Sequence, residues 1–340
     1  MRCGIVYPLY YIIIILIGLF LILKLFGFFT GTENLTLLRT SEFDYYHRMI
    51  ANPYRYNWTL LEQNFCTRYH PETRYLIIMH TASENFDRRR VYRLMYADEY
   101  FQQFGVRLLF TVGHSTNRLV NDLVQKESAI HHDLIQQNFI DSYQNLTWKA
   151  LMSLRFVKEY CNETRYVIST DDDVIINLWE VIKILQMYPN IPEEKDECNQ
   201  TIFCNIIRHQ KVIRNPFHKW YQSKAEFPDD YYKDYCAALA IIIPGPLINK
   251  LFEAAKNETF HKFDDYFLTG IVARKVGVKF KDFSKKAFNH IHKSDRKAFL
   301  SRRIYFQATE TITQTEEMWT VLKQLHKRRS LLNKEKHYWH

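Results

Sequence analysis

The hydrophobic pattern of the chain changes twice, from apolar to polar and then to an alternation of short apolar and amphipathic segments. Residues 4–23 are almost entirely apolar, and the run continues past Lys24 to residue 29. Roughly 20 apolar residues are enough for a helix to cross a bilayer. A cleaved signal peptide is the competing interpretation, but it would be shorter and end at a small-residue cleavage site. We see no such site, so the pattern predicts a signal-anchor transmembrane helix over 4–29, behind a cytosolic tail of residues 1–3.

The segment that follows, residues 30–69, is polar, has little periodicity and is predicted to be a lumenal stem. Asn-x-Ser/Thr triplets, the acceptors of N-linked glycans, occur here and throughout the rest of the chain. The predicted glycosylation sites are Asn34, Asn57, Asn162, Asn199 and Asn257. Their density predicts that everything beyond the anchor is lumenal. Five of the six cysteines also lie beyond the anchor, so we expect disulfides and an odd cysteine that is free or bridges to a partner.

From residue 74 onward, short apolar runs alternate with amphipathic stretches. The runs predict buried strands over 74–82, 106–113, 133–140 and 165–173, and the stretches between them predict helices over 87–105, 118–132 and 145–161. This alternation predicts an α/β domain with a mostly parallel sheet and helices on both faces. We place this catalytic domain over 70–295. A basic helical extension over 296–340 follows, with an amphipathic helix around Met318, Leu322 and Leu325.

Composition and charge narrow the function classes. The hydrophobic fraction of 47% and the aromatic fraction of 16% are ample for a packed core and exclude a disordered chain. The formal net charge of +9 favours anionic partners such as nucleotides, acidic glycans or a membrane surface. No zinc-finger or RNA-binding signature accompanies the charge, so we predict no nucleic-acid partner.

Three adjacent carboxylates, Asp171, Asp172 and Asp173, stand at the end of the predicted strand 165–173. Like charges this close repel and raise one another's pKa, so the arrangement is costly unless a positive group lies nearby. A divalent metal is one such group, because hard cations take carboxylate oxygens. A solvated acidic turn is the alternative, since Asp is common in turns. Ligands of parallel α/β sheets bind beyond the carboxyl ends of the strands, which favours the metal.

Several motifs, in order along residues 74–280, resemble those of the β-1,3-galactosyltransferase family. This family (glycosyltransferase family 31) includes β-1,3-N-acetylglucosaminyltransferases. The matches are "RRVYRLMY" with Arg89 and Arg93, "DSYQNLTWK" from Asp141 to Lys149, "DDDVIIN" from Asp171, "KWY" around Trp220, and "DDYFLTG" with Asp264 and Asp265. The resemblance implies a GT-A fold, a UDP-sugar donor, Mn²⁺, a glycan acceptor on a glycoprotein or glycolipid, and inversion at the anomeric carbon. It also implies a single-pass type II protein of the Golgi membrane.

The resemblance also implies roles for particular residues. Asp173 is the leading metal ligand and Asp171 the second candidate ligand, which could instead contact the ribose or a metal-bound water. Asp172 has a supporting role on the donor side. Asp265 is the general base, although either Asp264 or Asp265 suits a helix N-cap. The remaining donor-side candidates are Arg89, Arg93, Asp141 and Lys149, and the acceptor-side candidates are Trp220 and Asp264. For Arg89 and Arg93 a solvated helix face is the alternative, and we expect only one of them to contact diphosphate. Lys149 could instead be an exposed helix residue, and Trp220 a core residue.

Two departures from the family pattern bear on activity. Ala238 and Ala240 stand in "CAALAI" where the family has glycines, and Ser169 stands where it often has Lys. Glycine permits positive φ and close backbone approach, so the alanines could narrow the donor pocket. A catalytically silent UDP- or glycan-binding member of the fold is therefore the alternative function. A metal-dependent phosphohydrolase is a third hypothesis, but it would need further metal ligands that the sequence does not show. We further predict that Asn145 is not glycosylated, because it lies inside the motif around Asp141.

Overall fold

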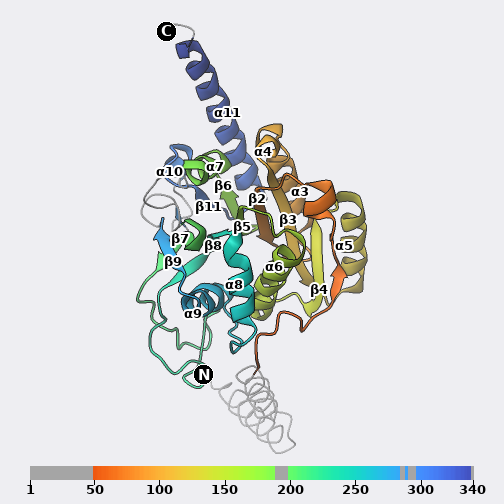
Figure 1. Cartoon of the computed structure of the whole chain (residues 1–340), viewed down its shortest axis with the longest axis vertical. Helices are drawn as coiled ribbons and strands as arrows, with labels where there is room; N and C mark the ends of the chain where they lie inside the picture. Colours follow the sequence, from red (N-terminus) through yellow and green to blue (C-terminus); the bar gives the residue numbers. More distant parts are fainter. Residues whose placement is uncertain (1–48, 188–197, 284–287, 290–295, 338–340) are drawn as a thin grey trace, which may run out of the picture. The chain divides into compact units, whose positions relative to one another are not determined.

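A computed structural model of the chain describes residues 49–187, 198–283, 288–289 and 296–337. Residues from Ile50 onward belong to one compact unit, and its described residues are drawn in colour in Figure 1. The described part contains two sheets with helices packed around them.

The larger sheet of the described chain has eight strands. In spatial order they are β1 (Trp58–Leu60), β4 (Leu134–Ile140), β3 (Val106–His114), β2 (Tyr75–His80), β5 (Tyr166–Asp171), β8 (Tyr235–Pro244), β7 (Thr201–Ile207) and β9 (Lys279–Asp282). Strands β4, β3, β2 and β5 run parallel to one another, as the alternation of helix and strand predicts. Strand β8 runs antiparallel to both β5 and β7, and β1 antiparallel to β4. The sheet is therefore mixed.

A smaller three-stranded sheet is formed by β10 (Phe288–Asn289), β11 (Phe306–Ala308) and β6 (Val174–Ile176). Strand β6 follows the aspartate triplet directly, and β11 pairs with it antiparallel. The triplet therefore occupies the turn between the two sheets, where chain segments far apart in sequence meet.

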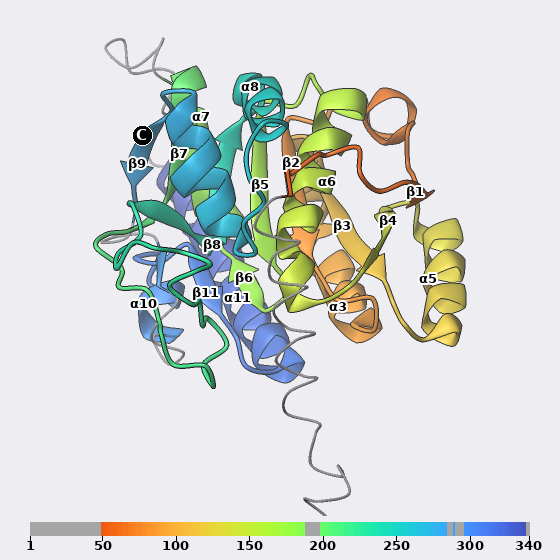
Figure 2. The ribbon, with the colours of Figure 1, turned by 90° about the horizontal axis from the view of Figure 1, so that it is seen from below.

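Helices cover both faces of the large sheet. The α-helices are α3 (Phe86–Tyr96), α4 (Glu99–Gln103), α5 (Arg118–His131), α6 (Leu146–Tyr160), α7 (Leu178–Met187), α8 (Gly245–Ala255), α9 (Ala273–Lys275), α10 (Arg296–Leu300) and α11 (Ile312–His337). Short 3₁₀ or π segments are η1 (Phe65–Tyr69), η2 (Tyr143–Asn145), η5 (Cys198–Gln200) and η6 (Tyr266–Val272). Figure 2 shows α6 and α8 on one face of the sheet and α3 and α11 on the other.

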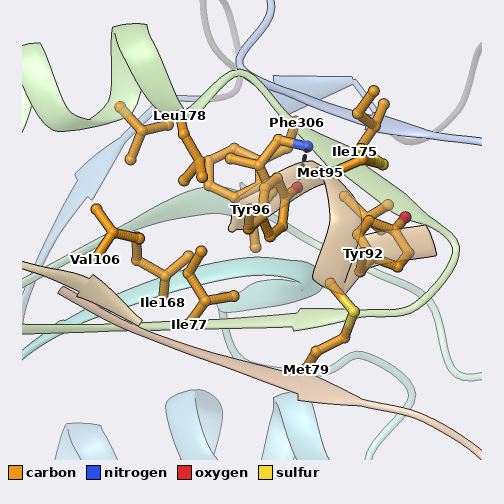
Figure 3. Packing of buried hydrophobic residues seen from close by; sticks show 14 of the residues in the cluster. Ile77, Met79, Tyr92, Met95, Tyr96, Val106, Ile168, Ile175, Leu178 and Phe306 are labelled. Atoms are coloured by element: carbon orange, nitrogen blue, oxygen red, sulfur yellow. Dashed lines mark hydrogen bonds between the residues drawn. The ribbon is translucent and has the colours of Figure 1, made fainter. Parts of the chain in front are cut away.

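One large cluster of core residues lies between the large sheet and the helices of the α3 face. Ile77, Met79 and Ile168 project from β2 and β5 onto Tyr92 and Tyr96 of α3 (Figure 3). The Tyr96 hydroxyl, although buried, accepts a hydrogen bond of 3.1 Å from the backbone N–H of Ile176. Burying a hydroxyl without a partner would cost free energy, so this bond fixes β6 against α3 and thereby fixes the chain just after the triplet.

The helix predicted over 87–105 is two helices. Asp98 interrupts it: its backbone is extended, and its carboxylate accepts a hydrogen bond from the Tyr100 N–H as the N-cap of α4. Gly105 ends the segment, as predicted, with a φ of 73°. A side chain there would collide with the Glu72 carbonyl at 2.3 Å, so glycine is required for both its conformation and its lack of a Cβ.

Residues 50–69 of the predicted stem pack onto the sheet. Strand β1 pairs with β4, and a disulfide joins Cys66 to Cys161 at the end of α6. A second disulfide joins Cys204 of β7 to Cys236 of β8. Two disulfides are typical of proteins that fold in an oxidising compartment.

The C-terminal helix α11 packs onto the core with its first half. Met318, Trp319 and Leu322 are buried, and Trp319 stacks on Trp179 of α7 with ring centroids 5.1 Å apart. The apolar stripe around Met318 and Leu322 thus belongs to the core. The rest of the helix extends past the other elements of the unit (Figure 1).

The predicted fold class needs one correction. Four of the seven strand pairs in the large sheet are parallel, as predicted, although the sequence pattern did not reveal that β8 returns antiparallel beside β5. The predicted transmembrane helix over 4–29 lies outside the described residues, and no helix among the described residues is long and apolar enough to cross a membrane. The described residues form a mixed α/β fold, and within them neither the predicted membrane-spanning helix nor any support for a single-pass Golgi membrane protein is found.

Four predicted glycosylation sites lie in the described chain. The side chains of Asn57, Asn162, Asn199 and Asn257 are exposed, whereas Asn34 lies outside the described residues. Asn145 is half-buried, and its amide donates a hydrogen bond of 2.8 Å to the Ile140 carbonyl.

Candidate active site

The aspartate triplet forms a turn that hydrogen bonds hold from two sides. Asp171 ends β5, where it lies beside His80 at the end of β2. The carboxylate of Asp172 is buried and accepts hydrogen bonds from Thr81 Oγ1 at 2.6 Å and Asn85 Nδ2 at 2.7 Å. The carbonyl of Asp173 accepts bonds from the Thr309 N–H at 2.7 Å and Oγ1 at 3.1 Å. The Asp172 carboxylate is thus held within the turn, whereas Asp171 is half-buried and Asp173 is exposed.

The carboxyls of Asp171 and Asp173 retain an excess of negative charge. Burial and the carboxylates of Asp173, Asp264 and Asp172 raise the pKa of Asp171 well above its ordinary value, against the opposing effect of Lys149. Partial burial and Asp172 raise the pKa of Asp173, although the positive charges of Arg88 and Lys219 oppose this. The positive charges of Lys149, Arg88 and Lys219 therefore do not neutralise the negative charge of these carboxylates.

Asp264 and Asp265 form a second pair of acidic side chains near the triplet. Both precede the π-helical segment η6, and Asp265 Oδ1 accepts the Tyr266 N–H at 2.7 Å. Burial raises the pKa of Asp264. Burial and the neighbouring Asp264 carboxylate raise the pKa of Asp265 from 3.8 to about 8, despite hydrogen bonds from Tyr266 and Ala238. The carboxyl of Asp265 is thus tuned toward the range in which a general base works best.

Aromatic side chains lie beside these carboxyls. Burial, together with the charges of Asp265, Asp264 and Asp171, raises the pKa of Tyr143, and the hydrogen bond between the Tyr143 hydroxyl and Trp220 opposes this. The Lys219 ammonium lies 4.7 Å from the Trp220 ring centroid and 6.0 Å from that of Tyr143. Trp220 is 45% exposed and is therefore not a core residue. Exposed aromatic faces next to a candidate base suit the C–H surface of a sugar.

Lys149 is buried rather than exposed, and its partner is Asp141. Its ammonium donates to Asp141 Oδ1 at 2.7 Å and to the Thr81 carbonyl at 2.8 Å. The other oxygen of Asp141 accepts the Gly113 N–H at 2.9 Å. A Cβ at Gly113 would lie 2.8 Å from the Asp141 Cα, so only glycine lets the two backbones approach so closely. This buried ion pair fixes the ends of β3 and β4 and the first turns of α6. The positive charge of Lys149 still acts on Asp171.

Arg89 and Arg93 lie within an ion-pair network on the other side of α3. Arg89 is fully buried and bonds Glu127 together with the carbonyls of Ala82 and Ser83. Arg93 bonds both Glu127 and Asp133. Burial raises the pKa of Glu127, but the bonds to the two arginines outweigh it, so the pKa of Glu127 lies below its ordinary value. The structure does not bring either guanidinium to the aspartate cluster.

Sequence reasoning missed Arg88, the neighbour of Arg89. Its Nη1 donates to the Asp172 carbonyl at 2.9 Å, and its charge acts on Asp173. It is one of three consecutive arginines in α3. Adjacent residues of a helix point in different directions, so the sequence alone does not tell which of the three faces the triplet. It was also missed that Tyr143, quoted in the motif from Asp141, lies beside the candidate base.

The chain accommodates its departures from the family pattern without strain. Ala238 and Ala240 lie within β8, and neither is among the positive-φ residues of the described chain. Ala240 packs in the core, and the backbone of Ala238 hydrogen-bonds to the Asp265 carboxyl. Ser169 lies 3.0 Å from the imidazole of His80, which burial keeps neutral by lowering its pKa to about 3.

The donor atoms of the triplet fit a divalent cation that also binds a ligand. Among the described residues, no three His, Cys, Asp or Glu side chains are grouped closely enough to hold a metal. Mg²⁺-type sites commonly use one or two protein carboxylates together with substrate phosphates. Asp171 and Asp173 match that pattern, because both carry oxygen ligands and both have a raised pKa that a bound cation would reverse.

Comparison with known proteins gives a consistent result. Residues 87–284 match the model of the galactosyltransferase family. Human beta-1,3-galactosyltransferase 1 is 29% identical over 240 residues, which cover 70% of each chain. Human lactosylceramide 1,3-N-acetyl-beta-D-glucosaminyltransferase is 29% identical over 211 residues, 60% of this chain and 54% of that protein. Human beta-1,3-galactosyltransferase 5 is 26% identical over 178 residues, 52% of this chain and 54% of that protein.

Proposed function

The chain belongs to the galactosyltransferase family and is a hexosyltransferase that uses a nucleotide-sugar donor and a glycan acceptor, and from this premise we propose a specific reaction. The enzyme transfers galactose, or alternatively N-acetylglucosamine, from a UDP-sugar to a sugar hydroxyl in β-1,3 linkage with inversion. The observation that carries the proposal is that two acidic pairs lie close together: Asp171 of the triplet and the pair Asp264 and Asp265 all act on Tyr143, and Asp173 and Asp264 both act on Asp171.

In this proposal the pair Asp171 and Asp173 binds the donor. Asp171 and Asp173 hold a divalent cation, which supplies Lewis-acid stabilisation of the charge that develops on UDP. Asp172, through Thr81 and Asn85, keeps the turn in place. Arg88, rather than Arg89 or Arg93, offers its positive charge to the diphosphate, because its guanidinium is the one that lies beside the triplet. Arg89, Arg93 and Lys149 position the elements that carry these groups.

The pair Asp264 and Asp265 acts on the acceptor. Inversion needs a base that takes the proton of the acceptor hydroxyl on the side opposite UDP. Asp265 fills this role, with its carboxyl held by the Tyr266 N–H. Trp220 and Tyr143 present their rings to the acceptor sugar, and Asp264 tunes the base through its charge.

A donor screen tests the proposal. The full chain is incubated with Mn²⁺, a mixed set of glycan acceptors and each common UDP-sugar in turn, and UDP release and product mass are measured. We expect transfer from UDP-galactose or UDP-N-acetylglucosamine. Transfer only from another donor would refute the assignment of the sugar.

Replacing Asp173 with Ala is expected to weaken metal-dependent UDP binding. The carboxylate is proposed as a direct ligand, so the loss should be at least roughly 10–100-fold, which is typical of changing a residue behind a ligand. Calorimetric titration of UDP with and without Mn²⁺ measures it. Asp229→Ala, which removes an exposed carboxylate elsewhere, is the control. Undiminished metal-dependent affinity in Asp173→Ala would place the ligand at another residue.

The pH dependence of transfer is expected to reflect the raised pKa of Asp265. A base must be ionised, so kcat/KM for the acceptor should rise with pH through the neutral range, toward the pKa of about 8. Asp264→Asn removes the like charge that contributes to this shift, so the pKa of Asp265 falls and the acid limb of the profile moves to lower pH. An acid limb that stays in place, or moves to higher pH, would contradict the coupling between the two carboxyls.

A further inference from the structure

A groove separate from the acidic site lies between the short helix α10 and the outer half of α11. It is shallow and largely open to solvent, with a volume of about 590 Å³. The lining residues are Arg296, Lys297, Leu300, Ser301, Leu325 and Arg329. Two half-buried leucines thus form an apolar floor, and three cations surround it.

The positive charge of this groove is only partly neutralised by the protein. Arg296 lies 3.7 Å from Glu317, and both side chains are about half exposed. Among the described residues, Lys297 and Arg329 have no carboxylate within ion-pair distance. Nearby cations differ in this respect, since Arg302 pairs with Glu180 and Lys323 with Asp98. The groove therefore offers two available cations and a third that is weakly paired, which is complementary to an anion.

The groove is distinct from the catalytic residues and from the part of the chain that matches the family. The family model ends at residue 284, whereas α10 and α11 begin at Arg296 and Ile312. Thr309, which bonds the Asp173 carbonyl, lies just before α11. Leu325 is 13 residues beyond Ile312, or roughly 20 Å along a helix that rises 1.5 Å per residue. A ligand in the groove would therefore not touch the carboxylates of the triplet.

An anionic bilayer is a poorer fit than a soluble anionic ligand. A helix that lies in a membrane interface buries an exposed apolar face beside its basic one. Within residues 296–301 and 312–329, every apolar side chain is buried or half-buried. Met318, Trp319 and Leu322 face the core of the protein. These segments thus lack a face for insertion, while their shallow surface, which three cations surround, can admit a discrete ligand.

We propose that the groove between α10 and α11 binds an acidic oligosaccharide, one that carries sulfate or carboxylate groups. Its anionic groups pair with Lys297, Arg329 and Arg296, and the C–H surface of a sugar ring covers Leu300 and Leu325. The choice of a glycan as the ligand rests on the proposed function, in which the enzyme acts on glycan acceptors. The groove would hold a charged part of such a glycan away from the site of transfer.

The test measures binding of a labelled heparin hexasaccharide to the full chain in neutral detergent, without UDP-sugar or metal. The variant Lys297→Glu with Arg329→Glu should bind it roughly tenfold or more weakly, because two attractive charges become repulsive. The chemically desulfated hexasaccharide should bind wild type no better than it binds this variant. The matched control, Lys126→Glu with Lys250→Glu, changes the net charge equally at exposed positions on α5 and α8 and should bind like wild type.

Three results would overturn the proposal. The groove variant could bind the hexasaccharide as tightly as wild type, or the control could lose as much affinity as the groove variant. Alternatively, micelles doped with phosphatidylserine could bind through Lys297 and Arg329 while the hexasaccharide does not, which would make the ligand a lipid. Failure here is distinguishable from failure of the proposed reaction. The groove variant should still transfer sugar to a small neutral acceptor, and binding is measured without the donor.

Discussion

Replacing Asp265 with Asn is expected to lower the rate of sugar transfer by roughly 10²–10⁴-fold, the usual contribution of a general base. The amide keeps the shape of the side chain and can still accept the Tyr266 N–H as an N-cap. It cannot take a proton from the acceptor hydroxyl at neutral pH. The loss should therefore appear in turnover, measured as UDP release in the presence of acceptor, while UDP affinity changes little.

Asp264→Asn is the matched comparison for this prediction. Asp264 has the same chemistry and lies one position earlier, but its proposed role is to tune its neighbour by charge. It should retain far more activity than Asp265→Asn at a pH above the acid limb. If Asp265→Asn transfers sugar as fast as wild type and Asp264→Asn does not, the two roles are exchanged.

Replacing Lys149 with Met is expected to lower the free energy of unfolding by about 3–5 kcal/mol, which is typical of removing one partner of a buried ion pair. Only 3% of the Lys149 side chain and 8% of the Asp141 side chain are exposed. The substitution leaves the Asp141 carboxylate buried without its cation and the Thr81 carbonyl without its donor. Chemical denaturation followed by tryptophan fluorescence measures the change.

Two further variants isolate the ion pair as the cause. Lys158 lies on the same helix, but its partner Glu253 is 47% exposed, so Lys158→Met should lower the free energy of unfolding far less than Lys149→Met does. Adding Asp141→Asn to Lys149→Met removes the uncompensated charge and should restore part of the stability. Equal losses for Lys149→Met and Lys158→Met would show that the pair does not stabilise the fold as described.

The parallel half of the sheet could be predicted because its strands are buried on both faces. Strands such as β2 and β5 therefore read as continuous apolar runs between polar segments. The direction of β8 could not be predicted, because the residues between β7 and β8 form a long irregular loop, and an apolar run does not encode whether it lies parallel or antiparallel to its neighbour. The break between α3 and α4 was missed for a similar reason, since Asp98 continues the polar face of a helix and also suits an N-cap.

Within the site, residues next to one another in sequence were easier to predict than those joined across the fold. The carboxylates of Asp171 and Asp173 lie at a strand end as expected, because the end of the apolar run marks that position. Arg89 and Arg93 resembled donor contacts, but their partners Glu127 and Asp133 lie 34 to 40 residues later. Nothing in one sequence states that these side chains meet. The burial of Lys149 was missed because it likewise depends on the fold that brings Asp141 to it.

The configuration of the product is the most direct test of the central claim, that Asp171 and Asp173 hold the donor while Asp265 deprotonates an acceptor on the opposite side. Proton NMR of the full chain's reaction with UDP-galactose or UDP-N-acetylglucosamine, both α-linked donors, reports the anomeric configuration of the new bond as it forms. The predicted result is a β-linked product alone from wild type and almost none from Asp265→Asn. An α-linked product would contradict this account, because retention cannot arise from a single displacement assisted by a base on the far side.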